Sequence, residues 1–235
     1  MIELTLNNLD NLARGTAFLA TGGGGDPYIG KLMLKHQLEL GKKVKIISPD
    51  EIPDDTFACN VLSMGAPTVF VEKVPNGPSS LKAMREVEKI LGRKFNAIMP
   101  IEAGGVNATL PLVVGALSGL PVIDADGMGR AFPELQMVTY NVGDVDINPI
   151  VAINDFYETA IFNARSSGSG EWLARAVCVR MGGICQVACY PMNADQIRNT
   201  SVHHTIKLSF EIGELIQKAR EDKNDPVQEI INYMG

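Results

Sequence analysis

Hydrophobic positions along the first 125 residues alternate between a helical and a strand period. Apolar residues spaced three and four apart predict amphipathic helices, and short β-branched runs that end at Gly or Pro predict strands. The expected helices cover residues 3–13, 28–42, 79–92 and 108–119, and the expected strands cover 15–21, 44–48, 57–65, 95–102 and 120–124. Strands that are apolar on both faces suit a sheet covered by helices on each side. The pattern therefore predicts an α/β fold with a doubly wound, mostly parallel sheet.

The pattern changes after residue 135. Strands with short turns are expected over 137–143, 148–154, 157–164 and 174–190, with a short helix at 171–176 and a last helix over 201–220 capped by Ser201. We therefore divide the chain into an α/β ligand-binding core, residues 1–135, and a more β-rich extension, residues 136–235. The extension ends in a helix and is expected to belong to the same domain.

Composition and charge argue against nucleic acid and membrane as binding partners. A net charge of -6 argues against a nucleic-acid surface, which needs a basic patch to neutralise phosphates. The chain has no run of ~18 apolar residues and no cationic, then apolar, N-terminus, so neither a membrane span nor a signal peptide is expected. Four cysteines in a chain of 235 residues do not form a disulfide framework. We expect a cytoplasmic protein with reduced thiols and a small-molecule substrate.

Four glycine-rich segments are expected at one edge of the sheet. Ligands of open parallel sheets bind outside the carboxyl ends of the strands. The predicted strands deliver residues 21–27, 64–67, 102–107 and 124–134 to that edge, and three of these segments carry acids. Their convergence predicts a ligand site there.

The first of these segments contains four consecutive glycines, Gly22, Gly23, Gly24 and Gly25, followed by Asp26. The run fits neither the dinucleotide fingerprint nor the Walker pattern, so no dinucleotide cofactor is expected. Asp26 is placed to cap the next helix, where its carboxylate would occupy the amides that a phosphate needs. Two interpretations remain open: a tight turn, and close approach of the backbone to a small ligand. A mononucleotide phosphate site is the weaker form of the second.

The segment 124-DADGMGRAFPE-134 gathers three acids and an arginine. Asp124, Asp126 and Glu134 could coordinate a divalent metal through their oxygens. Equally, Arg130 could neutralise these carboxylates and hold the shape of the loop. A third interpretation has Arg130 clamping a carboxylate of the substrate.

Glu102 follows a predicted strand and precedes Gly104 and Gly105, which places it at the same edge. A carboxyl there is a candidate general base or ligand, and Asn107 is a candidate amide donor to a substrate carbonyl. The alternative for both is capping of the helix that begins near residue 108.

The histidines and cysteines give weaker indications of a functional site. His203 and His204 are adjacent, so at most one of them points into a site, and His203 joins the metal candidates. His36 lies on a predicted helix with a structural role. The cysteines fit core thiols better than a zinc site, because paired Cys-x-x-Cys spacing is missing.

Taken together, ATGGGGDP, IEAGGVNATLPL and LPVIDADGMGRAFPELQM resemble the signature run of the S-methyl thiohydantoin desulfurase-like family, which also occurs with hydantoinase and oxoprolinase proteins. The resemblance implies activity on a five-membered cyclic amide or thioamide, by hydrolytic removal of sulfur or by hydantoin-type chemistry. It also implies one bound divalent metal and a site lined by Gly22 to Gly25, Glu102 to Asn107 and Asp124 to Glu134. Members of that family are longer, so the resemblance implies that a further C-terminal domain is absent here.

Three hypotheses follow. In the first, the protein is a hydrolase in which water attacks the C=S or C=O carbon of the ring, with Glu102, Asp124 and Asp126 as catalytic residues. Its substrate-binding residues are Gly22, Gly23, Gly24, Gly25, Asp26, Gly104, Gly105, Asn107, Arg130 and Glu134. In the second, it is a non-catalytic module that binds a nucleotide or small anion and works with a hydantoinase-type partner. In the third, the chain is a folded domain without activity. A homo-oligomer is expected, because the late strands and the apolar stripe of 201–220 need a cover.

Overall fold

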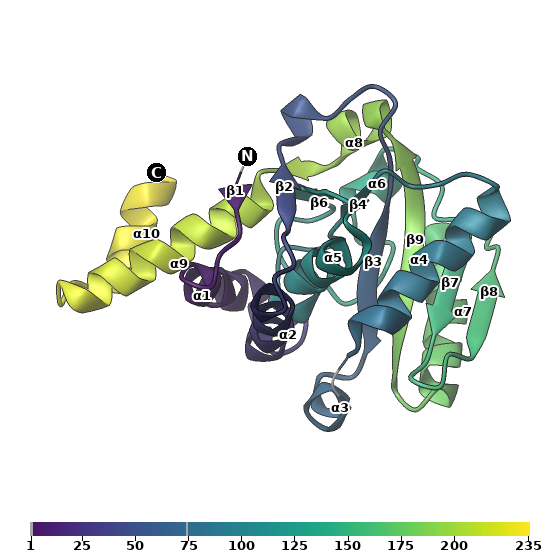
Figure 1. Cartoon of the computed structure of the whole chain (residues 1–235), viewed down its shortest axis with the longest axis horizontal. Coiled ribbons are helices and arrows are strands. Elements are labelled where there is room, and N and C mark those ends of the chain that lie inside the picture. Colours follow the sequence, from purple (N-terminus) through teal and green to yellow (C-terminus); the bar gives the residue numbers. More distant parts are fainter. Residues whose placement is uncertain (1, 74) are drawn as a thin grey trace.

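A computed structural model describes residues 2–73 and 75–235 and has the expected α/β fold (Figure 1). Within these residues, eight strands form one sheet in the order β1-β2-β5-β4-β3-β9-β7-β8. They are β1 (Ile2–Glu3), β2 (Lys45–Ile47), β3 (Phe57–Gly65), β4 (Ala97–Met99), β5 (Val122–Ile123), β7 (Ile150–Ile153), β8 (Thr159–Phe162) and β9 (Ile184–Asn193). A separate short ribbon pairs β6 (Ala125–Asp126) with β10 (Val202–His203).

Helices cover both faces of this sheet. They are α1 (Leu9–Ala20), α2 (Pro27–Glu39), α3 (Pro67–Glu72), α4 (Gly77–Leu91), α5 (Gly105–Ser118), α6 (Thr139–Val142), α7 (Ser167–Arg180), α8 (Ala194–Thr200), α9 (Thr205–Glu221) and α10 (Pro226–Met234), with a 3₁₀ turn, η1, at Pro49–Glu51. Helices α4 and α5 pack on one face, with α2 outside α5, and α7 packs on the other. The doubly wound arrangement is confirmed.

The two halves of the sheet differ in strand direction. Neighbours β2, β5, β4 and β3 are parallel, whereas β9, β7 and β8 continue the sheet in antiparallel pairs from β3. The parallel core predicted from the sequence is present, and the later region adds the antiparallel strands β7, β8 and β9 together with the helices α6 to α10. The carboxyl ends of the parallel strands therefore meet at one edge.

Side chains of β3 alternate between two hydrophobic cores, as the period of a strand requires. Leu62 and Met64 join the core beneath α7, whereas Cys59 and Val61 join the core beneath α4 and α5. The chain's cysteines are buried and unpaired with one another, as expected of core thiols.

The expected strand at 15–21 is wrong, because these residues form the end of helix α1 and the loop after it. The expected helix at 3–13 is likewise replaced by β1 and the start of α1. Helix α1 packs closely along α9, where Gly15 lies against the backbone of Ser209 and an added Cβ would overlap it. A short apolar run is compatible with the period of a helix and with that of a strand. The long-range contact between α1 and α9 favours the helix here.

Three later predictions also need correction. Residues 137–143 contain the short helix α6 instead of a strand, and Tyr140 on it is fully buried. Residues 174–180 belong to α7, and strand β9 begins only at Ile184. Ser201 ends α8 and does not cap the last helix, which begins at Thr205.

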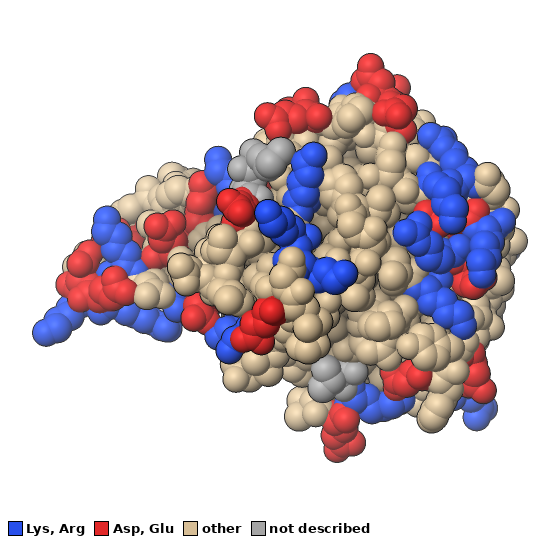
Figure 2. Space-filling view, in the orientation of Figure 1, with Lys and Arg blue, Asp and Glu red and all other residues tan. Residues whose placement is uncertain are grey.

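Figure 2 shows Lys and Arg at the right, the centre and the left of one face of the molecule, with acidic residues among them at the right and left and a group of acidic residues at the top. Helices α9 and α10 extend from the body of the molecule at the left of Figure 1. No described helix combines the length and apolar character needed to cross a membrane.

Candidate functional site

A cavity of about 350 Å³ opens at the carboxyl ends of β3 and β4. All four segments predicted to converge line it, together with one side chain from α7. Its polar and glycine lining comprises Thr21, Gly23, Gly24, Gly25, Ser63, Gly65, Glu102, Asn107, Arg130, Glu134 and Arg175. Apolar walls are added by Leu62, Met64, Phe70, Ile101, Phe132 and Leu135.

Glu102 is held in the wall of this cavity by two hydrogen bonds. The side-chain amide of Asn107 donates to its Oε1 (2.6 Å), and the backbone N–H of Phe132 donates to its Oε2 (2.8 Å). The residue is only 2% exposed. Both donors are themselves on the cavity lining, so they fix the carboxyl at the edge of the open space.

Burial raises the pKa of Glu102 from its ordinary 4.5 to about 7. Desolvation is the main cause, because a charged carboxylate loses its water here. The hydrogen bonds from Asn107 and Phe132 lower the pKa, and the charge of Asp126 raises it further. A group with a pKa near 7 can both take and return a proton at neutral pH.

Asn107 is itself clamped to strand β3. Its Oδ1 accepts from the backbone N–H of Ser63 (2.7 Å) and its Nδ2 donates to the Ser63 carbonyl (3.0 Å). The Ser63 hydroxyl accepts from Gln186 (3.0 Å), and Gln186 in turn accepts from Ser80 (3.0 Å). This buried network fixes the amide that orients Glu102.

The loop that contains Gly24 and the loop that contains Gly105 are in close backbone contact. The carbonyl of Gly24 accepts from Val106 N (2.7 Å) at the start of α5. A Cβ on Gly24 would overlap the Gly104 carbonyl, and a Cβ on Gly105 would overlap Gly24 and Gly25. Gly24 and Gly105 also have φ of 69° and 65°, in the region that favours glycine. The two glycine-rich loops thus interlock, and the amides of α5 serve this contact instead of a phosphate.

Two arginines stand at the cavity. Arg130 is exposed and donates to the Thr21 hydroxyl (2.7 Å). Arg175 donates to Glu171 (2.7 Å) and to the Pro133 carbonyl (2.9 Å), while Glu171 accepts from Leu135 N (3.0 Å). Glu171 and Arg175 therefore hold the 130–135 segment in place, and Arg130 remains at the surface.

Asp124 and Asp126 do not line the cavity, and each accepts hydrogen bonds from backbone N–H groups with a carboxylate oxygen. Oδ1 of Asp126 accepts from Met128 N and Gly129 N (both 2.6 Å), which closes its own loop. Oδ1 of Asp124 accepts from Ile206 N (2.7 Å) at the start of α9. Burial raises the pKa of Asp126 to about 6 and raises that of Asp124 as well.

Two family models match residues 7–164 and 165–235, described as the S-Me-THD-like N-terminal domain and the S-Me-THD-like C-terminal domain. The chain belongs to the S-Me-THD-like family. The resemblance drawn from the glycine-rich and acidic motifs is therefore confirmed, and the models meet later in the chain than the change of pattern near residue 135.

A crystal structure of a protein from Chromobacterium violaceum has the same fold, with a TM-score of 0.82 and 23% sequence identity. The match covers 100% of this chain and 66% of that one, so the chain spans just under two thirds of the neighbour's length. At this identity the likeness concerns the fold alone. A search of curated proteins gave no match.

The predicted site of this S-Me-THD-like chain is thus partly assembled. The cavity brings together Gly23, Gly24, Gly25, Glu102, Asn107, Arg130 and Glu134. The remaining candidates lie elsewhere: Gly22 is exposed, Gly104 and Gly105 form the interlock behind the wall, and Asp26 caps α2 by accepting from Tyr28 N (2.9 Å).

The four metal candidates do not form one group. Glu134 is exposed and accepts from Gln136 (2.5 Å), away from the two aspartates that hold backbone amides. Within residues 2–73 and 75–235, one group of three potential ligands is close enough to share an ion: Asp50, His203 and His204. It includes His203 but neither Asp124, Asp126 nor Glu134.

Sequence reasoning missed Arg175, Ser63 and Asp50. The spacing of Glu171 and Arg175 on a predicted helix was a usable signal for an ion pair. Ser63 and Asp50 gave no comparable signal, because each gains its role from segments distant in the sequence.

Proposed function

We propose that the chain hydrolyses a small five-membered cyclic amide or thioamide of the thiohydantoin or hydantoin type. One observation carries the proposal: a buried carboxyl with a pKa of about 7, Glu102, in the wall of a cavity of about 350 Å³. A cavity of this size suits a single small ring. Membership of the S-Me-THD-like family supports the choice of ring.

In the proposed step, the Glu102 carboxylate accepts a proton from water as the water oxygen attacks the ring carbon. With a thiocarbonyl, Glu102 returns its proton to the sulfur of the adduct, the C–S bond breaks, and the added hydroxyl loses its own proton as the new C–O bond becomes a carbonyl. The two protons of the water thus leave with sulfur as hydrogen sulfide. With a ring carbonyl, the C–N bond breaks, and the proton goes to nitrogen as the ring opens. General acid–base assistance of this kind contributes about 10²- to 10⁴-fold in rate.

The surroundings of Glu102 suit this role. Asn107 and Phe132 hold its two oxygens, so the carboxyl keeps one orientation while it gains and loses a proton. The apolar walls exclude competing water from the ring. Arg130, at the exposed side of the cavity, is placed to pair with a carboxylate carried by the substrate.

The donor set of the cavity does not suit a metal ion. Among the described lining residues, the buried carboxyl is Glu102, and both its oxygens already accept hydrogen bonds. Glu134 is exposed and bonded to Gln136. The proposed step is therefore assigned to the side chains of the cavity themselves.

The test is an assay of the purified chain with hydantoins and thiohydantoins, in which ring opening is followed by chromatography and hydrogen sulfide by its release. We expect turnover that Glu102→Gln lowers about 10³-fold. Glu134→Gln makes the same substitution at the mouth of the same cavity and is expected to keep most of the rate. Equal activity of wild type and Glu102→Gln on the best substrate would contradict the proposal.

The binding-module alternative makes a different prediction. The helix N-termini at the glycine loops are occupied, by Asp26 at α2 and by the Gly24 carbonyl at α5, and both contacts disfavour phosphate. Calorimetric titration with ATP, with and without magnesium, is expected to give no heat of binding. Micromolar binding of ATP without turnover of any ring would favour the module.

A further inference from the structure

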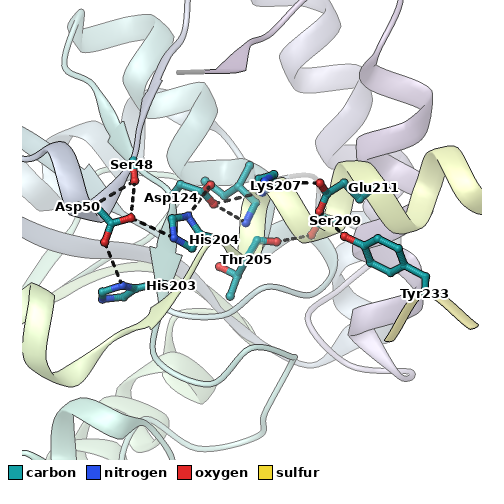
Figure 3. A network of polar contacts seen from close by, with 11 residues as sticks. Ser48, Asp50, Asp124, His203, His204, Thr205, Lys207, Ser209, Glu211 and Tyr233 are labelled. Carbon is teal, nitrogen blue, oxygen red and sulfur yellow. Dashed lines mark hydrogen bonds and ion pairs between the residues drawn. The ribbon is translucent and has the colours of Figure 1, made fainter. Parts of the chain in front are cut away.

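Outside the cavity, three potential metal ligands meet where β2 and β10 end. Asp50 lies on η1, directly after β2, His203 lies on β10, and His204 precedes α9. One ligand atom from each lies within 4.8 Å of the others. Figure 3 shows the two imidazoles on either side of the Asp50 carboxylate.

In each histidine, one ring nitrogen faces an oxygen of another residue and the other ring nitrogen faces Asp50. Nε2 of His203 lies 3.1 Å from the carbonyl oxygen of Arg198, which can only accept, so this nitrogen carries the proton. Nδ1 of His203 then has a free lone pair and lies 3.9 Å from Asp50 Oδ1. The hydrogen bond of one nitrogen thus selects the other as a ligand.

His204 also turns one ring nitrogen toward Asp50 and the other toward an oxygen of a second residue, here without a hydrogen bond to that residue. Its Nδ1 faces Oδ2 of Asp124 at 3.8 Å, and its Nε2 lies 3.1 Å from Asp50 Oδ2. Asp124 cannot turn away, because its Oδ1 accepts from the backbone N–H groups of Ile206 (2.7 Å) and Lys207 (3.1 Å). A fixed carboxylate behind an imidazole is the usual outer partner of a metal-binding histidine.

The backbone of His204 is held in an uncommon conformation. Its φ is 62°, in the left-handed region, and its N–H donates to the Asp124 carbonyl (2.7 Å). A non-glycine residue is rarely found there unless its surroundings hold it in place. This conformation places two adjacent imidazoles on the same side of the chain, which an extended strand would not do.

We propose that Asp50, His203 and His204 bind one divalent transition-metal ion of the zinc, cobalt and nickel class. Two imidazole nitrogens and one carboxylate oxygen favour these ions over magnesium and calcium, which prefer oxygen ligands alone. The side chains are 63%, 28% and 47% exposed, so an ion can enter and can keep water on its remaining positions.

The bound ion would tie the end of β2 to the start of α9. The inference does not rest on the proposed hydrolysis, because none of the three ligands lines the cavity. The competing explanation is an ion pair between a protonated histidine and Asp50, which needs no metal.

Calorimetric titration of the purified, metal-stripped chain with Zn²⁺ tests the inference, and Co²⁺ absorption identifies the ligands. We expect one ion per chain, and visible cobalt bands of a four- or five-coordinate site without thiolate absorption. His203→Gln and His204→Asn should abolish both signals, since Asn tolerates the left-handed backbone of position 204. Asp124→Asn should weaken binding about 10- to 100-fold.

His36→Gln, on α2, is the matched control and is expected to bind like the wild type. Circular dichroism checks that each variant is folded. Failure of the wild type to bind zinc, or binding that survives both His203→Gln and His204→Asn, would overturn the inference. Cobalt spectra dominated by thiolate absorption would do the same, because they would assign the ion to cysteine.

Discussion

Glu102 and Asp126 are both buried carboxyls whose pKa is raised by burial, yet they face different surroundings. Glu102 borders a cavity and is held by Asn107 and Phe132. Asp126 is fully enclosed and accepts from Met128 N and Gly129 N in its own loop. A raised pKa therefore occurs at both positions, and only the first has open space beside it.

The difference teaches that burial and a shifted pKa do not by themselves identify a catalytic acid. Asp126 and Asp124 shape the segments on which the site depends, whereas Glu102 alone among the three can meet a ligand in the cavity. Within the motif 124–134, Asp124 and Asp126 thus hold backbone segments outside the cavity, whereas residues 130–134 line it. The chemistry is proposed for Glu102. Four predictions test this division.

The largest expected effect is a difference in kcat/KM between variants of Glu102 and of Asp126. Glu102→Gln should lower kcat/KM by about 10³-fold, since the proton acceptor is lost. Asp126→Asn should change it less than about 10-fold, because its contact is with backbone amides. In the wild type, kcat/KM should rise with pH through about 7, as the Glu102 carboxyl ionises. Equal losses in the two variants, measured in steady state on one substrate, would remove the distinction.

The next effect concerns the wall that carries Glu102. Gly105→Ala should lower the free energy of unfolding by about 4 kcal/mol, because its Cβ would overlap the backbone of Gly24 and its φ disfavours other residues. Gly22→Ala also has a positive φ but meets nothing within 4 Å, so about 1 kcal/mol is expected. Urea unfolding measures both. Similar values would show that the interlock contributes little.

A third effect uses the pH dependence of stability. The folded-state pKa values, about 7 for Glu102 and about 6 for Asp126, exceed the ordinary 4.5 and 3.8. Between these limits the folded state binds more protons than the unfolded state, so stability falls as pH rises from about 4 to about 7. Each group accounts for a drop on the order of 3 kcal/mol.

Denaturant unfolding at several pH values checks this effect. Glu102→Gln should remove the upper part of the drop and Asp126→Asn the lower part. Stability that rises with pH over this window in the wild type would contradict the assigned pKa values.

The smallest effect concerns recognition at the mouth. Arg130→Gln should raise KM about 10-fold for a ring that carries a carboxylate, with kcat unchanged, because an exposed ion pair to the substrate is lost. A neutral ring of the same size serves as the control and should show no change. A fall in kcat for both rings would instead assign Arg130 a part in shaping the cavity.

Much of the fold follows from sequence pattern, because strands β2 to β5 and helices α2, α4 and α5 have clear periods and stops. The strand predicted at 15–21 failed because a short apolar run fits two periods. Its helical form is decided by the contact of Gly15 with Ser209, far away in the sequence.

The site divides in the same way. The four segments rich in glycines and acids were predicted to converge at one edge of the sheet, and all four line the cavity there. Topology accounts for the segments that follow β3, β4 and β5, whereas the glycine run 22–25 follows helix α1. The hydrogen-bond partners of Asn107 and Asp124 come from segments distant in the sequence and left no local pattern. The backbone N–H of Ser63 donates to Asn107, and that of Ile206 donates to Asp124. Residue type indicated the edge of the sheet that carries the cavity, and only the geometry separated Glu102 from the aspartates.

The interlock of Gly24 with Gly105 also bears on how ligands enter and leave. The backbones of the two loops are in such close contact that neither glycine has room for a Cβ, so we expect the two loops to move together. The 130–134 segment also lines the cavity, its residues Pro133 and Glu134 are exposed, and Arg175 donates a hydrogen bond to the Pro133 carbonyl. If ligands enter past this segment, loss of that hydrogen bond in Arg175→Ala is expected to change how fast they bind and leave.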